Sequence, residues 1–103
     1  MQRSSGNVFA DLGLDNSDEL LVKAELAYKI SSIITKLGIT QIEAAKLLGI
    51  DQPKISALIN GKLSDFSTVR LFRFLNSLGR DVEIVVKDKP KSRSQALTQV
   101  VTR

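Results

Sequence analysis

Hydrophobic and polar residues follow a helical spacing through most of the chain, and glycines divide this pattern into blocks. The first block predicts a long helix that begins at the capping residue Ser17 and ends at Gly38. Asp18 and Glu19 place negative charge in its first turn, where the positive end of the helix dipole lies. We expect its buried face to consist of Leu20, Leu21, Ala24, Ala27, Tyr28, Ile30, Ile33, Ile34 and Leu37.

Two short helices joined by a tight turn are predicted between residues 40 and 61. Thr40 can cap the first helix, Glu43 completes a capping box, and Gly49 can end the helix with a positive φ. Asp51 can cap the second helix, which Asn60-Gly61 closes. The expected inward-facing residues are Ile42, Ala45 and Leu48 in the first helix and Ile55, Leu58 and Ile59 in the second. Two helices in this arrangement form a helix-turn-helix pattern.

A fourth helix is predicted from the cap Ser67 to Gly79. Phe66, just before the cap, can pack against Leu71 as a hydrophobic staple. The buried stripe is expected to consist of Leu71, Phe74, Leu75 and Leu78. Phe72 lies off this stripe, so we expect the long helix or a second copy of the chain to cover it.

The period changes from helical to alternating at residues 82–86, VEIVV, which predicts a β-strand. A lone strand leaves its backbone groups unpaired. We therefore expect two chains to pair these strands antiparallel across a two-fold axis, with Val82, Ile84, Val86 and Phe72 forming the dimerisation surface. A partner strand from residues 7–12 of the same chain is the alternative. The predicted fold class is mainly α, a helix-turn-helix bundle of four or more helices followed by this one strand.

Both ends of the chain are polar. Residues 1–16 form an N-terminal arm, in which the apolar stretch 8–12 is expected to pack on the first helix or, alternatively, to bind a partner. Residues 87–103 form a basic tail that we expect to be disordered, and that could aid solubility, contact phosphates or fold on a partner. The helix-turn-helix domain with its dimerisation strand is thus predicted to span residues 17–86.

Seven residues of the helix pair fall in a known pattern: Gln41, Ala45, Gly49, Ile50, Ile55, Ser56 and Leu58. At these positions the chain resembles the Xre family of helix-turn-helix regulators, which includes the phage lambda repressor. The resemblance implies a lambda-repressor-like bundle in which Gln41 holds a DNA phosphate at a helix N-terminus and the third helix enters the major groove. The proline at position 53 is a departure from the pattern of many relatives. Its ring cannot form a hydrogen bond, so a base contact that a polar residue would make there is lost or becomes apolar.

The outer side of the third helix carries residue types that can read DNA. Gln52 can pair with adenine, Lys54 can donate to guanine or phosphate, and Ala57 can contact a thymine methyl group. The hydrophobic pattern alone would also fit an ordinary αα-hairpin, which would need none of these types. The residues predicted to bind DNA bases or backbone are Gln41, Gln52, Pro53, Lys54, Ser56, Ala57, Asn60 and Lys62.

Basic residues are concentrated in the segment that holds the helix pair. Residues 29–80 carry a net charge of +5, whereas residues 1–28 carry −3 and residues 81–103 carry +2. This asymmetry is typical of a module that binds a polyanion. The sequence contains no cysteine and no histidine, which excludes disulfides, thiolate metal sites and a histidine base. We expect no enzymatic activity, no cofactor and no metal site.

These features predict a homodimeric repressor that binds an inverted-repeat operator in double-stranded DNA. No stretch resembles a membrane span or a signal peptide, so we expect a cytoplasmic protein without membrane contact. Up to about Lys87 the chain is similar to compact HigA-like antitoxins, which implies an antitoxin with a RelE-like toxin as partner. The alternative is a protein-interaction module that neutralises a partner protein without specific DNA binding. An enzyme is the third class, but the scattered carboxylates offer it no site.

Overall fold

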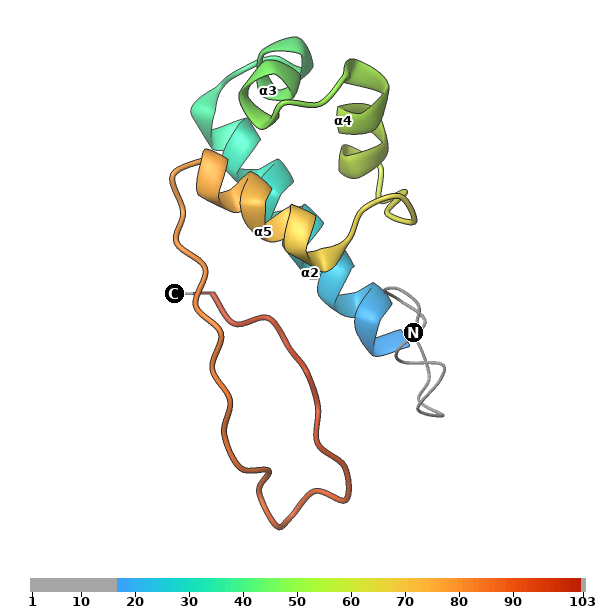
Figure 1. Cartoon of the computed structure of the whole chain (residues 1–103), viewed down its shortest axis with the longest axis vertical. Helices are drawn as coiled ribbons and strands as arrows, with labels where there is room; N and C mark the ends of the chain where they lie inside the picture. The colour runs from blue at the N-terminus through green and yellow to red at the C-terminus, as the bar shows by residue number, and fades with distance from the viewer. Residues whose placement is uncertain (1–16, 103) are drawn as a thin grey trace.

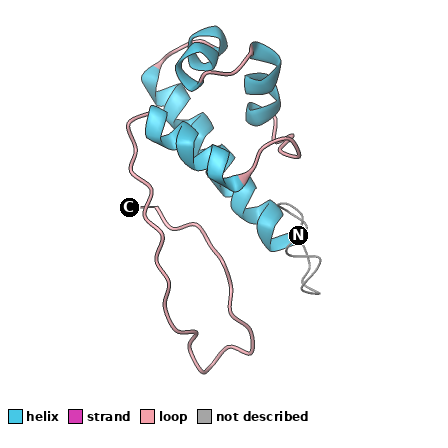
Figure 2. Cartoon of the chain, viewed as in Figure 1, coloured by secondary structure: helices cyan, strands magenta, loops and turns pink. Residues whose placement is uncertain are grey.

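The computed structural model describes residues 17–102, which form four helices followed by an irregular segment (Figures 1 and 2). The helices are α2 (Ser17–Leu37), α3 (Gln41–Leu48), α4 (Gln52–Ile59) and α5 (Thr68–Ser77). α2 packs against α4 and α5, and α3 also packs against both. The four helices predicted from the sequence are therefore present in the described part of the chain. None of them is long and apolar enough to cross a membrane.

One apolar core fills the space between the helices. Ile30 of α2, Ile55 of α4 and Leu71 of α5 are each 0% exposed and lie at its centre. The other buried apolar residues are Val22, Leu26, Ala27, Ile33, Ile34, Ala44, Ala45, Leu48, Leu58, Leu63, Phe66, Phe74, Leu75 and Leu78. The core therefore holds α4 in place from its inner side and leaves its outer side free for other contacts.

The buried face of α2 differs from the predicted one. It consists of Val22, Leu26, Ala27, Ile30, Ile33 and Ile34. Five residues predicted to be buried are exposed: Leu20, Leu21, Ala24, Tyr28 and Leu37. The stripe at positions 20, 24 and 28 lies on a different side of α2 from the buried residues, and all three side chains are exposed. The expectation that Tyr28 is a packing residue was wrong, since its exposed fraction is 77%.

Each of the three shorter helices begins at its predicted cap. Thr40 and Glu43 form a complete capping box at the start of α3. The Lys54 N–H donates to Asp51 Oδ1 at 3.0 Å at the start of α4. At the start of α5, the backbone N–H three residues after Ser67 donates to Ser67 Oγ at 3.1 Å. Each cap satisfies a backbone donor that the first helical turn would otherwise leave unpaired.

α5 buries the stripe that its sequence predicts, namely Leu71, Phe74, Leu75 and Leu78. Phe66 is buried as well and meets Phe74 edge to face, with 6.0 Å between the ring centroids and 75° between the ring planes. Phe72 is half-buried and packs against the core. The aromatic side chains thus fasten both the start and the middle of α5.

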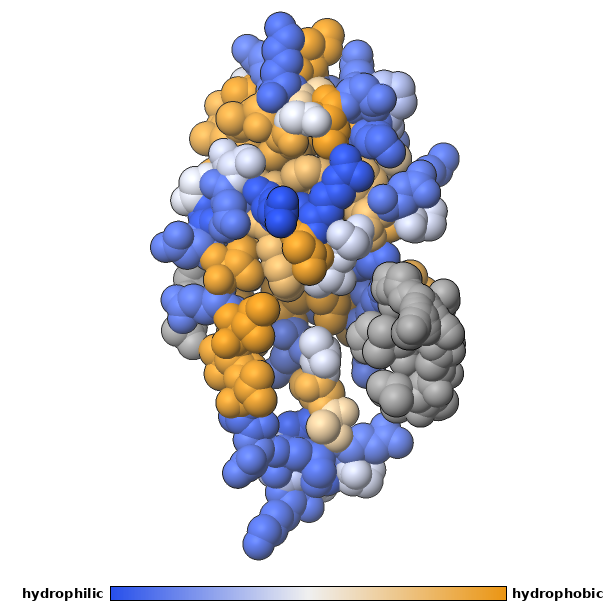
Figure 3. Space-filling model, in the orientation of Figure 1, coloured by the Kyte–Doolittle hydropathy of each residue, from blue (hydrophilic) through white to orange (hydrophobic). Residues whose placement is uncertain are grey.

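The predicted strand at residues 82–86 is not formed within residues 17–102 of this single chain. Val82 packs against the core, whereas Ile84, Val85 and Val86 are exposed, and a hydrophobic strip follows this segment on the left of Figure 3. A single chain cannot display a strand that pairs with a second copy, so the pairing stays a prediction. The alternative partner at residues 7–12, like the apolar stretch of the arm, lies outside the described residues.

The C-terminal segment turns at residues 91–92 and runs back toward the helices (Figure 1). Near its end, Val100 packs against the core. Val100 and Thr102 line a shallow groove with Ala24 and Tyr28 of α2. The end of the described chain therefore lies beside the exposed stripe of α2.

Candidate nucleic-acid interface

The N-terminal end of α3 is fixed by its capping box. The Thr40 N–H donates to Glu43 Oε1 at 2.8 Å, and the Glu43 N–H donates to Thr40 Oγ1 at 3.1 Å. Gln41 is the first residue of α3 and is exposed. Its amide therefore stands beside the positive end of the helix dipole, where an anion is favoured.

The turn between α3 and α4 has a left-handed residue at its centre. Gly49 has φ 73°, and its N–H donates to Lys46 O at 3.3 Å. The Ile50 N–H reaches back to Ala45 O at 3.0 Å, as in a Schellman motif. Ile50 itself packs against the core. These contacts set the direction in which the chain enters α4.

The inner face of α3 contains two alanines where one was predicted. Ala45 is buried as expected, and Ala44 beside it is 0% exposed. The predicted core residue Ile42 is instead 55% exposed. Consecutive residues of a helix point about 100° apart, so a face that includes both alanines turns Ile42 outward. Small side chains on this face allow α3 and α4 to approach closely.

α4 is apolar toward the bundle and polar on its outer side. Ile55 and Leu58 are 0% and 1% exposed, so the helix cannot rotate without leaving the core. Gln52 and Pro53 are exposed in its first turn. Lys54 and Ser56 are partly buried. Ala57, which was predicted to contact a thymine methyl group, is also partly buried and packs against the core.

Three predicted DNA-binding residues share one stripe of this outer side. Gln52, Ser56 and Asn60 are spaced four residues apart, which places them one above the other. The Asn60 Nδ2 donates to Ser56 Oγ at 3.4 Å. The stripe therefore presents two amides and a hydroxyl in a row along the helix.

The chain leaves α4 through a second left-handed glycine. Gly61 has φ 77°, and the next N–H, that of Lys62, donates to Ala57 O at 2.9 Å. Lys62 is exposed just past the end of the helix. Its ammonium group and that of Lys54 are thus placed along α4 and its exit, where they could meet phosphates on either side of a groove.

The chemistry of this surface suits the binding of nucleic acid. Amide, hydroxyl, ammonium and methyl groups can read base edges and hold phosphates. Within residues 17–102, no three Asp or Glu side chains gather where they could hold a metal ion.

Comparison with known proteins agrees with this geometry. A family of helix-turn-helix domains matches residues 8–87 of the chain. A solved structure named as an XRE family transcriptional regulator has 45% sequence identity and a TM-score of 0.83, over 86% of this chain and 100% of that chain. The chain belongs to the Xre family of helix-turn-helix regulators. A search of proteins with curated annotation found no significant match.

In this Xre-family chain the four residues predicted to form a dimer surface do not lie in one environment. Phe72 and Val82 are half-buried and pack against the core. Ile84 and Val86 are 75% and 90% exposed. The second pair is therefore far more exposed in the single chain than the first.

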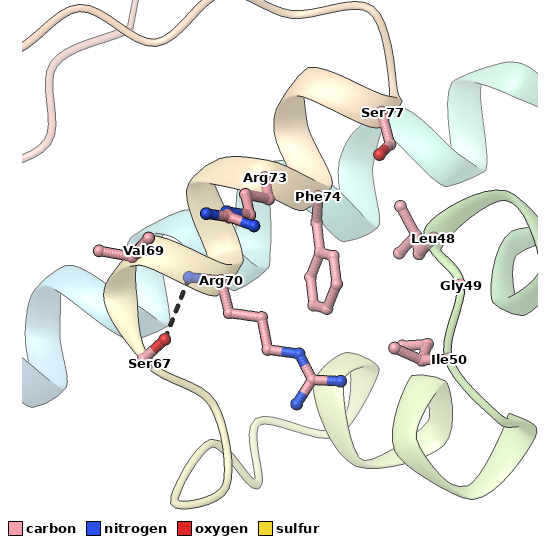
Figure 4. A pocket seen from close by; sticks show the side chains of 9 residues that line it. All are labelled: Leu48, Gly49, Ile50, Ser67, Val69, Arg70, Arg73, Phe74 and Ser77. Carbon is pink, nitrogen blue, oxygen red and sulfur yellow. Dashed lines mark hydrogen bonds between the residues drawn. The ribbon is translucent and has the colours of Figure 1, made fainter.

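A groove between the turn and α5 of this Xre-family chain was not predicted from the sequence (Figure 4). Its volume is about 400 Å³, and Leu48, Gly49, Ile50, Ser67, Val69, Arg70, Arg73, Phe74 and Ser77 line it. The Arg70 guanidinium carbon lies 5.6 Å from the ring centroids of both Phe66 and Phe74. The signal that could have revealed this cluster is the spacing of four residues between Phe66, Arg70 and Phe74.

Proposed function

We propose that this chain binds double-stranded DNA in a sequence-specific manner and represses transcription by occluding a promoter. The observation that carries the proposal is the outer side of α4. It carries Gln52, Ser56 and Asn60 in one polar stripe, and its inner side is anchored by the buried Ile55 and Leu58. Asp51 caps its N-terminal end, and the chain leaves its C-terminal end through the left-handed Gly61. A rigid helix with such a surface can enter the major groove.

Each residue of this surface has a proposed role that follows from its chemistry. Gln52 and Lys54 read base edges, together with Ser56 and the methyl group of Ala57. Pro53, which has no hydrogen-bonding group, makes at most an apolar contact. Residues that hold the backbone on either side are Gln41, Asn60 and Lys62.

We further propose that the chain acts as a homodimer on an inverted repeat. Exposed apolar side chains follow one another at Ile84, Val85 and Val86, with exposed fractions of 75%, 65% and 90%. Their backbone groups form no hydrogen bond with other residues of the described part of the chain. Antiparallel pairing with a second copy would satisfy those groups and cover the side chains. Val86→Lys should therefore give a monomer in analytical ultracentrifugation, whereas a dimer that persists would contradict this arrangement.

Neutralisation of a partner protein is a second candidate function, and the surface of α2 favours it. Leu20, Leu21 and Tyr28 are 54%, 55% and 77% exposed. Together these three side chains form an apolar stripe, and the acidic residues Asp18 and Glu25 are close to it in the sequence. A basic partner such as a RelE-like toxin would suit this stripe, which supports the role of an antitoxin. Coexpression with the product of the neighbouring reading frame tests it, because an antitoxin must form a complex with that product.

The DNA-binding proposal can be tested with a pool of random duplexes. The intact chain should enrich one sequence, and the double variant Gln52→Ala with Lys54→Glu should lose retention of that duplex while its helix content and oligomeric state stay unchanged. A matched control is Lys29→Glu, which makes the same charge change on α2, where Lys29 lines the groove beside Tyr28 and Val100. The control should retain the duplex. Equal retention by the double variant would favour the interaction module.

A further inference from the structure

Both ends of α4 lead to the same aromatic pair. On the N-terminal side, Gly49 and Ile50 line the groove together with Phe74 of α5. On the C-terminal side, the segment that follows α4 ends at Phe66, which is 2% exposed and in edge-to-face contact with Phe74. The placement of α4 relative to the bundle therefore depends on where this pair of rings is held, in addition to the burial of Ile55 and Leu58.

Arg70 covers the two rings. Its guanidinium carbon lies 5.6 Å from each ring centroid, within the range of about 6 Å for a cation–π interaction. Its backbone is fixed by the hydrogen bond from its N–H to Ser67 Oγ. Among the described residues, the ion pair found is between Lys23 and Glu19, and no carboxylate pairs with the Arg70 guanidinium. The described contacts of the guanidinium are thus with the rings.

The groove lies at the opposite end of α3 from the proposed phosphate contact. Leu48 and Gly49, at the C-terminal end of α3, line it. Gln41 begins α3 seven residues earlier, which is about 10 Å along the helix axis. Figure 4 shows the Arg70 side chain reaching from α5 into the space below Phe74 on the side of Ile50. Arg70 therefore lies away from the proposed phosphate contact at Gln41, and its described contacts are with the two rings.

We propose that Arg70 is a positioning residue for DNA recognition. By clamping Phe66 and Phe74 together it holds both ends of α4 at the angle that base contacts require, without touching DNA itself. This inference rests on the proposed function, and its experiments separate the two.

The first experiment compares Arg70→Met with Arg73→Met. Methionine keeps an unbranched apolar stem but removes the guanidinium. Arg73 lines the same groove one turn later, is exposed, and has no cation–π contact with the described rings, so it is the matched control. Affinities for the selected duplex and for a scrambled duplex are measured at several salt concentrations, at a temperature where both variants are fully folded.

We expect Arg70→Met to lower the ratio of the two affinities about tenfold, as for the loss of one good base contact, with an unchanged salt slope. Arg73→Met should leave the ratio unchanged, and Arg70→Lys should fall between Arg70→Met and the unmodified chain because an ammonium lacks the planar face. An unchanged ratio in Arg70→Met overturns the proposal. So does a salt slope that decreases by about one, which would make Arg70 a phosphate contact.

The second experiment needs no DNA. Hydrogen exchange of the backbone amides of α4 should be faster in Arg70→Met, relative to the amides of α2, and unchanged in Arg73→Met. Equal acceleration across all helices would show a general loss of stability and overturn the positioning role. If the random pool yields no preferred duplex, the proposed function fails, while the exchange pattern still decides whether Arg70 holds α4.

Discussion

The turn before α4 allows the cost of one substitution to be worked out from the structure. Gly49 has φ 73°, a left-handed conformation that costs an alanine about 1 to 2 kcal/mol. A Cβ atom added at Gly49 would have no heavy atom within 4 Å, so steric clash adds nothing. Alanine also restricts the unfolded chain, which returns about 0.4 to 1 kcal/mol. Gly49→Ala should therefore lower the free energy of unfolding by about 1 kcal/mol.

Urea denaturation followed by circular dichroism measures this loss, and a thermal melt should show a decrease of about 4 to 8 °C. The matched variant Gly49→Asn should lose less, because asparagine adopts the left-handed conformation more readily. A loss above about 3 kcal/mol, typical of a disrupted core, would mean that the side chain does meet a neighbour. No loss at all would mean that the turn is not left-handed in solution. Either result would refute the reasoning.

Three further predictions use the same surface and core. Asp51→Ala removes the cap of α4 and should lower the free energy of unfolding, measured in urea, by about 1 kcal/mol. Asp51→Ser should lower it much less, because serine can also cap a helix. Ile55→Ala opens a cavity at a fully enclosed position, so its urea midpoint should correspond to a loss of about 2 to 5 kcal/mol; a loss as small as that of a surface variant would contradict the packing of α4. Lys62→Ala should weaken retention of selected and scrambled duplexes by a similar factor and lower the salt slope by about one, and a selective loss of the selected duplex would assign Lys62 to base reading instead.

The elements that the sequence predicted well are those determined by near neighbours. The caps at Thr40, Asp51 and Ser67 each need one side chain and a backbone N–H three residues away, so the spacing of the residues predicts them. The left-handed turn at Gly49 likewise depends on a local conformation that glycine favours. The outer side of α4 could also be predicted, because the buried Ile55 and Leu58 determine which side of the helix faces solvent.

The elements that the sequence predicted less well depend on which surfaces meet. α2 has apolar residues on two stripes, and only the position of the shorter helices decides that Leu26 is buried and Tyr28 exposed. The same holds in α3, where Ala44 and not Ile42 faces the core. The cluster of Arg70 on Phe66 and Phe74 joins a residue before α5 to residues within it. Helical spacing ranks candidates for burial but does not place the neighbouring helix.

Residues 82–86 differ from the helices in where their backbone hydrogen-bond partners can come from. A helix completes its backbone hydrogen bonds within its own segment, so α2 to α5 are visible in a single copy. A strand completes them only with a partner, and Ile84 to Val86 have unpaired backbone within the described residues and apolar side chains open to solvent. Covering one such side chain contributes about 1.5 to 3 kcal/mol, enough for several of them in two copies to offset a part of the cost of association. Pairing of these segments would also fix the spacing of the two α4 helices, so the same residues that close the fold would determine the spacing of the operator half-sites.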